Sequence, residues 1–87
     1  MISNGTYSEL FVRLTIVTTV QKKFGKRIRE LRTAKGYSQE ELADKAGIHW
    51  TYLGRIERGE QNPTLKNIEK LANALDTPLR DLFSFDN

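Results

Sequence analysis

The sequence contains no cysteine, only one histidine, and no hydrophobic run long enough to span a bilayer. Without cysteine, the chain cannot form disulfides, a thiolate zinc site or a cysteine nucleophile, and a metal site would need carboxylates alone. It also lacks a nucleophile paired with a base and a glycine loop that could hold phosphates. We therefore expect a protein that is not an enzyme, uses no cofactor or metal, and does not enter a membrane.

At 87 residues, the chain is expected to form one domain with a modest core. Its net charge of +3 is mild, but basic residues crowd one short segment. They are Lys22, Lys23, Lys26, Arg27, Arg29, Arg32 and Lys35, opposed only by Glu30. Such a cluster suits a polyanion, because neutralising phosphates releases counterions. The alternative is a solvated helix face, and charge alone does not decide between the two.

Two short helices joined by a tight turn are predicted between Ser38 and Gly59. Ser38 and Glu41 form a capping box, which satisfies two of the free amide donors at a helix start. An apolar stripe follows, and Gly47 stands where the end of this helix needs a left-handed residue. The pattern therefore predicts a first helix that is amphipathic and sharply terminated.

The second helix begins after Ile48, and its apolar positions are Leu53 and Ile56. The remaining residues are left largely on other faces: Trp50, Thr51, Tyr52, Gly54, Arg55 and Arg58. Two helices around a short turn containing glycine, the second presenting hydrogen-bonding side chains, form a helix-turn-helix signature. Residues 38–58 are thus predicted to be a DNA-binding unit.

Three stretches carry a resemblance to a known family: IRELRTAKGYSQEELADKAGI, YLGRIERGEQNPTL and IEKLANAL. From about Phe24 to Phe83 the chain resembles the lambda-repressor-like (Cro/C1, XRE) helix-turn-helix family. Within that family, TYLGRIERGEQNPTL looks closest to the controller proteins of restriction–modification systems and to compact phage-type repressors. The resemblance implies a compact all-α domain of five helices, acting in the cytoplasm and encoded by a bacterium or a phage.

Helices are also predicted on both sides of the central unit. Apolar residues at helical spacing predict a first helix over residues 22–35 and a fourth over residues 64–75, whose buried stripe begins at Leu65. A proline opens a fifth helix at about 78–84. The DNA-binding domain is therefore expected to span residues 22–85.

The N-terminal extension, residues 1–21, fits the family poorly. Apolar and other residues alternate with a period of two, and many are β-branched, which predicts a strand. A lone strand needs a partner, which the same segment of a second subunit would provide. An irregular arm, a helical continuation of the first helix and a disordered tail are the other interpretations that the sequence leaves open.

Three residues near the start of the second helix of the unit are placed to reach base edges: Trp50, Thr51 and Arg55. Arg55 suits a bidentate bond to guanine O6 and N7. Thr51 can donate or accept, and its methyl can pack on a thymine methyl. Trp50 would lie against thymine methyls or a sugar edge, or fold back on the protein. Gly54 either lets the helix approach the groove floor or is simply tolerated.

Further roles are implied by the resemblance. Gln39 matches the family glutamine that bonds a phosphate and braces the recognition helix, and Arg32 is expected to form an ion pair with Glu57. Contacts that position the DNA backbone without reading sequence are expected from Ser38, His49, Tyr52, Arg58, Gln61, Asn62 and Lys66.

The end of the chain is more apolar than a small core needs. Part of it is expected to form a dimer contact, through Leu79, Leu82, Phe83 and Phe85; the alternative is that all of it packs internally. A homodimer would place two recognition helices on an inverted-repeat operator in double-stranded DNA. Glu40 and Asp44 suggest an activating contact with RNA polymerase. The alternative function is a protein-interaction module, such as an antitoxin that binds a partner protein.

Overall fold

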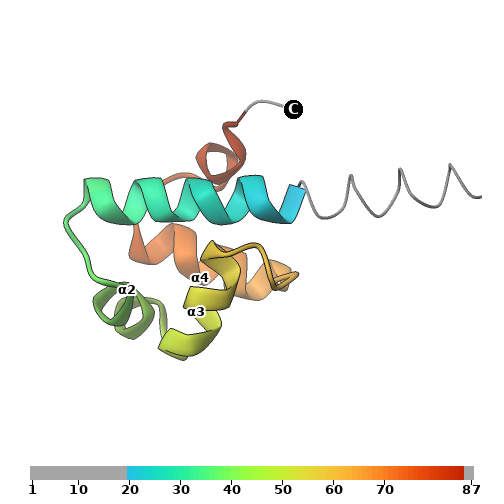
Figure 1. Cartoon of the computed structure of the whole chain (residues 1–87). Helices are drawn as coiled ribbons and strands as arrows, with labels where there is room; N and C mark the ends of the chain where they lie inside the picture. The colour runs from blue at the N-terminus through green and yellow to red at the C-terminus, as the bar shows by residue number, and fades with distance from the viewer. Residues whose placement is uncertain (1–19, 86–87) are drawn as a thin grey trace, which may run out of the picture.

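The computed structural model describes residues 20–85, and every regular element in that range is helical. A helix over residues 20–34, called here the long helix, is followed by α2 (Gln39–Ala46), α3 (Trp50–Glu57) and α4 (Leu65–Ala74) (Figure 1). A short 3₁₀ helix, η1 (Leu79–Phe83), comes last. The all-α class is confirmed, and the last of the predicted helices has the tighter 3₁₀ form.

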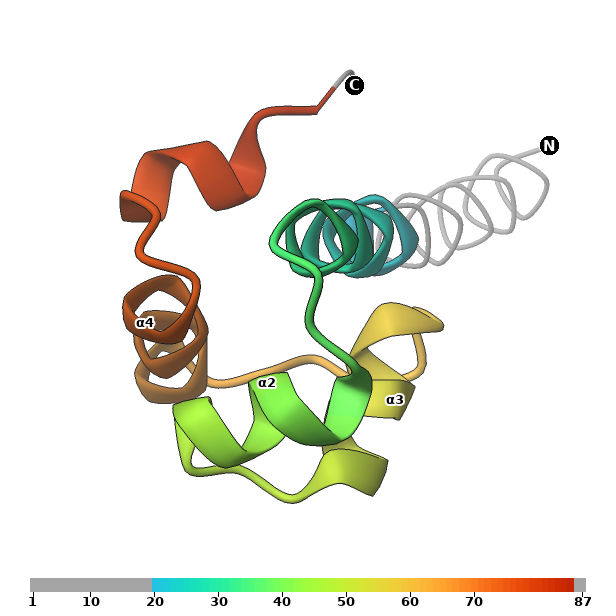
Figure 2. The same cartoon turned by 90° about the vertical axis from the view of Figure 1, so that its left-hand side faces the viewer.

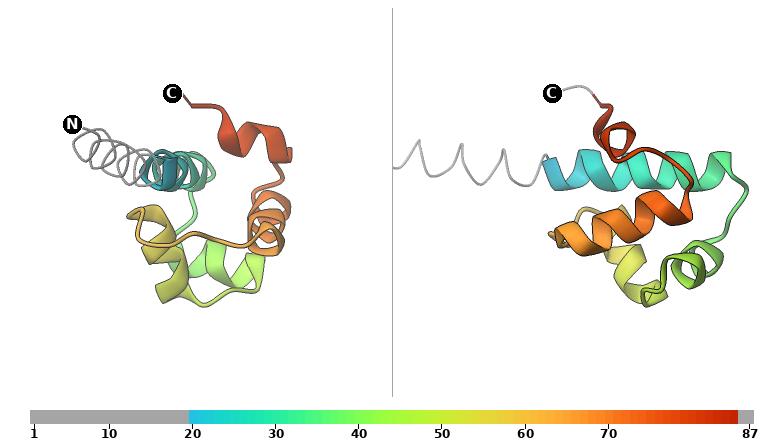
Figure 3. Two further views of the ribbon diagram at one scale, coloured as in Figure 1. Left: turned by 90° about the vertical axis from the view of Figure 1, so that its right-hand side faces the viewer. Right: turned by 180° about the vertical axis from the view of Figure 1, so that it is seen from behind.

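The long helix lies between two groups of elements. Figures 1 and 2 show α2 and α3 together on one side of it, α4 alongside, and η1 on the other side. The opposite views in Figure 3 show the same separation of η1 from α2 and α3. The fold therefore places the helix-turn-helix unit and the C-terminal segment at opposite ends of the domain.

Local signals in the sequence set the bounds of α2. The Ser38 hydroxyl accepts from the amide of Glu41 at 3.0 Å, and the Glu41 carboxylate accepts from the amide of Ser38 at 2.7 Å. These bonds to Ser38 lower the pKa of the Glu41 carboxyl below its usual range, because they favour the charged form. At the other end Gly47 adopts φ 70°, and its amide bonds back to the last turn. Both ends of α2 are therefore fixed by local hydrogen bonds.

The core is formed by one apolar face from every helix. Its buried residues are Phe24, Ile28, Leu42, Ala43, Ala46, Leu53, Ile56, Ile68, Leu71, Ala72, Leu75 and Leu82. Leu82 is 0% exposed, so its predicted role in a dimer contact is wrong: this side chain anchors η1 to the rest of the domain. Phe85 is half-buried and also packs against the core.

The predictions for the N-terminal extension fall mostly outside the described residues. Residues 1–19 lie outside them, so the strand-like arm and its alternatives stay predictions there. Residues 20 and 21 belong to the long helix and not to a strand, since each residue added to an existing helix gains a backbone hydrogen bond. None of the helices within residues 20–85 combines the length and the apolar character that a membrane span requires.

Gly25 lies where the long helix touches the C-terminal end of α3. A Cβ at this position would lie well inside contact distance of the Ile56 carbonyl oxygen and 2.7 Å from that of Glu57. Both obstacles are backbone atoms, which cannot rotate away. The close approach of the two helices therefore requires glycine at this position.

We expect Gly25→Ala to destabilise the protein, although alanine ordinarily stabilises a helix interior by about 1 kcal/mol relative to glycine. The clash with the α3 carbonyls should lower the free energy of unfolding by about 2 kcal/mol or more. Urea unfolding followed by circular dichroism measures the change. Lys26→Ala, at the exposed neighbouring position, is the control and should change stability by less than about 0.5 kcal/mol. A more stable Gly25→Ala protein would contradict the close contact.

Candidate nucleic-acid interface

One face of α3 is exposed and carries polar and basic side chains. Leu53, Gly54 and Ile56 are buried, whereas Thr51 and Arg55 are exposed. With Arg58 at the C-cap, the exposed residues recur at i, i+4 and i+7, which places them in one stripe along the helix. Trp50, the first residue of α3, is 48% exposed and does not fold back into the core. The three residues predicted to reach bases therefore lie at the surface of the same helix.

The ion pair expected between Arg32 and Glu57 is present. Arg32 Nε donates to Glu57 Oε2 at 2.7 Å, and Arg32 Nη2 donates to Glu57 Oε1 at 3.0 Å, an arrangement in which two bonds run side by side. Arg32 Nη1 also donates to the Tyr37 carbonyl at 2.8 Å. The bond to Glu57 raises the pKa of Arg32 above its usual range. The side chain of Glu57 is 3% exposed, so this carboxylate is almost fully removed from water.

Gln39 completes this network from the start of α2. Its Nε2 donates to Glu57 Oε1 at 3.0 Å, so the side chain braces the C-terminal end of α3. Gly54 lies beside it: a Cβ there would be 3.7 Å from Gln39 Oε1 and 3.2 Å from Arg58 Nη1. Gly54 is buried, so the prediction that placed it on a free face is wrong. Its missing side chain leaves room for Gln39 and Arg58.

Several of the predicted backbone contacts are held in place by their neighbours. The Tyr52 hydroxyl accepts from Asn67 Nδ2 at 3.2 Å, which leaves its own proton free to donate to a phosphate. Arg58 forms two hydrogen bonds with Glu60, at 3.1 and 3.2 Å, between exposed side chains. The bond raises the pKa of Arg58 and lowers that of Glu60. Asn67, which no spacing rule singles out, is a functional neighbour that the sequence did not reveal.

The other predicted backbone contacts lie in four different parts of the domain. Ser38 is exposed at the start of α2, and His49 is the N-cap of α3, where its side chain accepts from the Thr51 amide. Gln61 and Asn62 lie in the loop that leads from α3 to α4. Lys66 instead lines a groove between α4 and η1, so the structure groups it with that groove.

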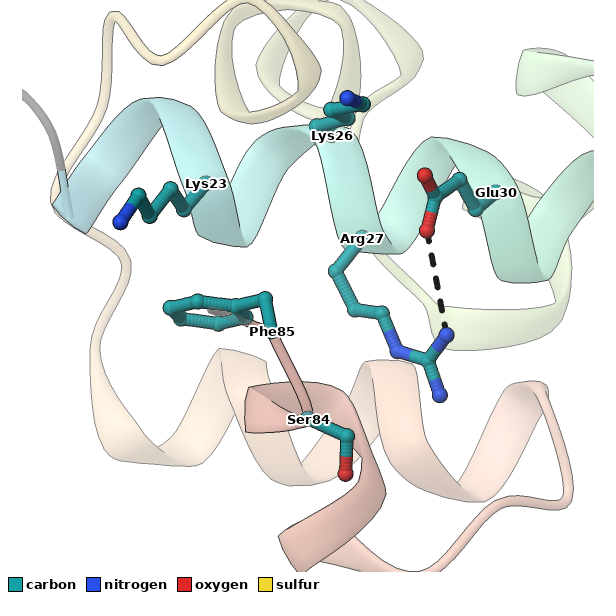
Figure 4. Close-up of a pocket in the computed structure, with 6 residues that line it drawn as sticks. All are labelled: Lys23, Lys26, Arg27, Glu30, Ser84 and Phe85. Carbon is teal, nitrogen blue, oxygen red and sulfur yellow. Dashed lines mark ion pairs between the residues drawn. The ribbon is translucent and has the colours of Figure 1, made fainter. Parts of the chain in front are cut away.

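The basic cluster of the long helix is not one surface. The guanidinium of Arg32 is paired with Glu57. Arg27 Nε donates to the Asp81 carbonyl at 2.9 Å, and this bond connects η1 to the long helix. A pocket of about 350 Å³ is lined by Lys23, Lys26, Arg27, Glu30, Ser84 and Phe85. Figure 4 draws these six side chains, with the ion pair between Arg27 and Glu30 dashed. Glu30 lies 3.8 Å from Arg27 and offsets part of the positive charge.

A groove between α4 and η1 has a largely apolar lining. It measures about 510 Å³ and is lined by Leu65, Lys66, Ile68, Glu69, Leu79, Arg80 and Phe83. Leu79 and Phe83 are 48% and 46% exposed, as a docking surface requires. Leu65 is 84% exposed, so its assignment to the buried stripe of α4 is wrong: at the first position of the helix the chain has not yet reached the core.

Comparison with known proteins agrees with this geometry. The sequence model of the helix-turn-helix family (HTH_3) matches residues 28–82. The control protein C.BamHI of Bacillus amyloliquefaciens is 39% identical over 71 residues, which span 80% of this chain and 88% of that protein. The transcriptional regulator SinR of Bacillus subtilis is 46% identical over 59 residues, but these cover 67% of this chain and only 53% of SinR.

Two solved structures are similar as well. The restriction–modification controller protein C.AhdI from Aeromonas hydrophila superposes with a TM-score of 0.72 at 57% identity, covering 72% of this chain and 96% of that one. The structure of SinR in complex with DNA superposes with a TM-score of 0.66 at 45% identity, covering 68% of this chain and 95% of that one.

We expect Arg32→Ala to lower the free energy of unfolding by about 3 kcal/mol, because it leaves the buried Glu57 carboxylate without its cation. Chemical denaturation measures this loss. Arg29→Ala removes an exposed arginine from the same helix and should cost less than about 0.5 kcal/mol. The double variant Arg32→Met, Glu57→Leu should recover much of the stability, since it removes both charges. Equal effects of Arg32→Ala and Arg29→Ala would contradict the role of the ion pair.

Proposed function

The chain belongs to the helix-turn-helix family and is a DNA-binding transcriptional regulator, and we propose that it binds an inverted-repeat operator as a homodimer. We further propose that it acts as a controller of a restriction–modification operon or as a phage-type repressor, in the cytoplasm and without enzymatic activity. One observation carries this proposal most directly: the exposed stripe of α3, held rigidly by the buried ion pair behind it.

The proposed contacts follow from the position of each side chain on α3. A major groove about 12 Å wide admits an α-helix. Trp50 and Thr51 begin α3, and Arg55 lies one turn after Thr51 on the same exposed stripe, from where its long side chain can reach a base edge. Arg55 makes no side-chain hydrogen bond or ion pair within residues 20–85, so its guanidinium is free to bind guanine O6 and N7. Thr51 contacts a neighbouring base, and the exposed indole of Trp50 packs on thymine methyls or a sugar edge.

Phosphate contacts on either side of the major groove of DNA fix the position of α3 along the duplex. The amides at the start of α2 carry the positive end of the helix dipole, and Ser38 and Gln39 stand beside them. His49 and Tyr52 flank the exposed stripe of α3, Arg58 closes the stripe at the C-cap, and Gln61 and Asn62 follow in the loop. These contacts contribute affinity without reading sequence.

We propose that α2 provides a contact with RNA polymerase. Glu40 and Asp44 are both exposed and lie one helical turn apart, so they present two carboxylates on one face. Neither is engaged by a cation at hydrogen-bonding distance within residues 20–85. A basic surface on the polymerase would complement them when the regulator sits just upstream of a promoter.

We propose that the two copies of the dimer meet at the groove between α4 and η1. Five large hydrophobic residues are exposed within residues 20–85, and three of them, Leu65, Leu79 and Phe83, line this groove. Its rim carries charges of both signs, from Lys66, Glu69 and Arg80. A two-fold contact brings the same surface of both copies together, so the basic rim of one copy can face the acidic rim of the other. This self-complementarity favours a second copy as the occupant.

Selection of bound sequences from a random duplex pool tests the DNA contacts. We expect an inverted repeat whose half-sites lie roughly 34 Å apart. Arg55→Ala should weaken binding by about 1–3 kcal/mol and relax one position in each half-site. Arg58→Ala is the matched control: it should weaken all sequences alike and reduce the salt dependence by about one phosphate contact. An unchanged motif for Arg55→Ala would contradict the base contact.

Sedimentation and native mass spectrometry test the dimer. Leu65→Asp and Leu79→Asp place charge in the groove without touching the core and should give a monomeric protein that still folds. Their affinity for the full operator should fall at least about tenfold, which corresponds to about 1.4 kcal/mol of lost cooperative binding. Trp50→Ala removes an exposed aromatic outside the groove and should remain dimeric. A wild-type protein that stays monomeric on its operator would overturn the dimer and leave the interaction module, such as an antitoxin, as the interpretation of the groove.

A further inference from the structure

His49 does more than precede the recognition helix. As the N-cap of α3, it places its ring nitrogen Nδ1 at 3.2 Å from the amide nitrogen of Thr51. The same nitrogen lies 2.5 Å from the Thr51 hydroxyl. The ring also stacks beside the indole of Trp50, with 6.3 Å between ring centroids and 20° between ring planes. One side chain thus contacts both Trp50 and Thr51, the first two residues of α3.

The positions of the protons follow from these contacts. A backbone amide can only donate, so Nδ1 must offer its lone pair to the Thr51 amide. The proton of the neutral imidazole therefore lies on Nε2. Because Nδ1 then has no proton to give, the short contact is made by the Thr51 hydroxyl donating its only proton, and the single lone pair of Nδ1 is shared between the hydroxyl and the more distant amide. The Thr51 oxygen is left with acceptor capacity alone.

We infer that His49 fixes the Thr51 hydroxyl as a hydrogen-bond acceptor toward DNA, so that Thr51 selects an amino base, adenine or cytosine, at the position it reaches. In the major groove the only base donors are adenine N6 and cytosine N4, whereas guanine O6 and N7 and thymine O4 accept. This inference rests on the proposed contact of Thr51 with a base. His49 is a positioning residue in this scheme and Thr51 the specificity-determining one.

This role differs from that of an ordinary N-cap residue, which only accepts a hydrogen bond from a backbone amide. A threonine hydroxyl without such a partner rotates and can donate to keto bases as readily as it accepts from amino bases. Removing the His49 ring would release it. An asparagine at the same position keeps an acceptor oxygen for the start of the helix and should preserve the orientation. His49→Ala and His49→Asn therefore differ in specificity and not only in stability.

The test compares sequences selected from a random duplex pool by four proteins: wild type, Thr51→Val, His49→Ala and His49→Asn. The position whose preference changes in Thr51→Val is the one that Thr51 reads. At that position the wild type and His49→Asn should prefer amino bases by about fivefold or more. His49→Ala should reduce this preference to less than about twofold, with overall affinity lowered alike for all sequences. A keto base at that position in the wild type, or an unchanged preference in His49→Ala, would overturn the inference.

The same pool distinguishes this failure from failure of the proposed function. If Thr51→Val changes no position while Arg55→Ala does, α3 still reads DNA and the inference alone is overturned. If neither variant changes the motif, the proposed recognition by α3 fails as well.

The tautomer can be measured without DNA, because the chain contains a single histidine. A long-range ¹H–¹⁵N correlation spectrum of the full chain, with the imidazole neutral, should show the proton on Nε2 and an unprotonated Nδ1. A proton on Nδ1 would overturn the inference whatever the DNA experiment gives. In Thr51→Val the amide remains while the hydroxyl is lost, so the tautomer should be retained. A switch of the proton to Nδ1 in that variant would show that the hydroxyl itself had kept Nδ1 unprotonated, which supports its role as the donor.

Discussion

The buried carboxylate of Glu57 is the point on which the arrangement of the domain depends. It stands at the C-terminal end of α3, where the helix dipole disfavours negative charge, and it is almost fully removed from water. Both of these costs must be offset locally. Arg32 from the long helix supplies a side-by-side pair of charged bonds, and Gln39 from α2 supplies a third bond. Three helices are therefore held in one register by a single charge.

The glycines around this carboxylate follow from the same constraint. The backbone of the long helix approaches α3 so closely that no side chain fits at Gly25, and α3 has no side chain at Gly54 where Gln39 and Arg58 pass. Each glycine weakens its own helix, by about 1 kcal/mol relative to alanine. At Gly25 the cost accompanies a close contact between two backbones, which brings Arg32 of the long helix within reach of Glu57. The exposed stripe of α3 is consequently presented from a rigid base.

Local patterns in the sequence predicted the fold well, and tertiary detail less well. The capping box at Ser38, the left-handed Gly47 and the apolar stripes depend on neighbours in sequence, so their consequences could be read directly. The Arg32–Glu57 pair came from the family resemblance, since no spacing rule links residues so far apart. The placement of Leu82 in the core and of Leu65 at the surface could not be predicted, because η1 and the first turn of α4 are too short for periodicity to separate inside from outside. The bond from Thr51 to His49 was missed because histidine is an uncommon N-cap.

The path from the proposed dimer groove to the proposed DNA-binding face is short. Tyr52 on α3 accepts from Asn67 on α4, and the groove begins two residues earlier on α4, at Leu65. One hydrogen bond between α3 and α4 thus links the residues that would set the two-fold axis of the dimer to those that would enter the major groove of DNA. A rotation of α4 relative to α3 would have to break this bond and disturb the buried core to which Ile68 of α4 and Leu53 of α3 both belong. The separation of two recognition helices in such a dimer is therefore a property of the core, and the spacing of half-sites that the dimer tolerates should be narrow.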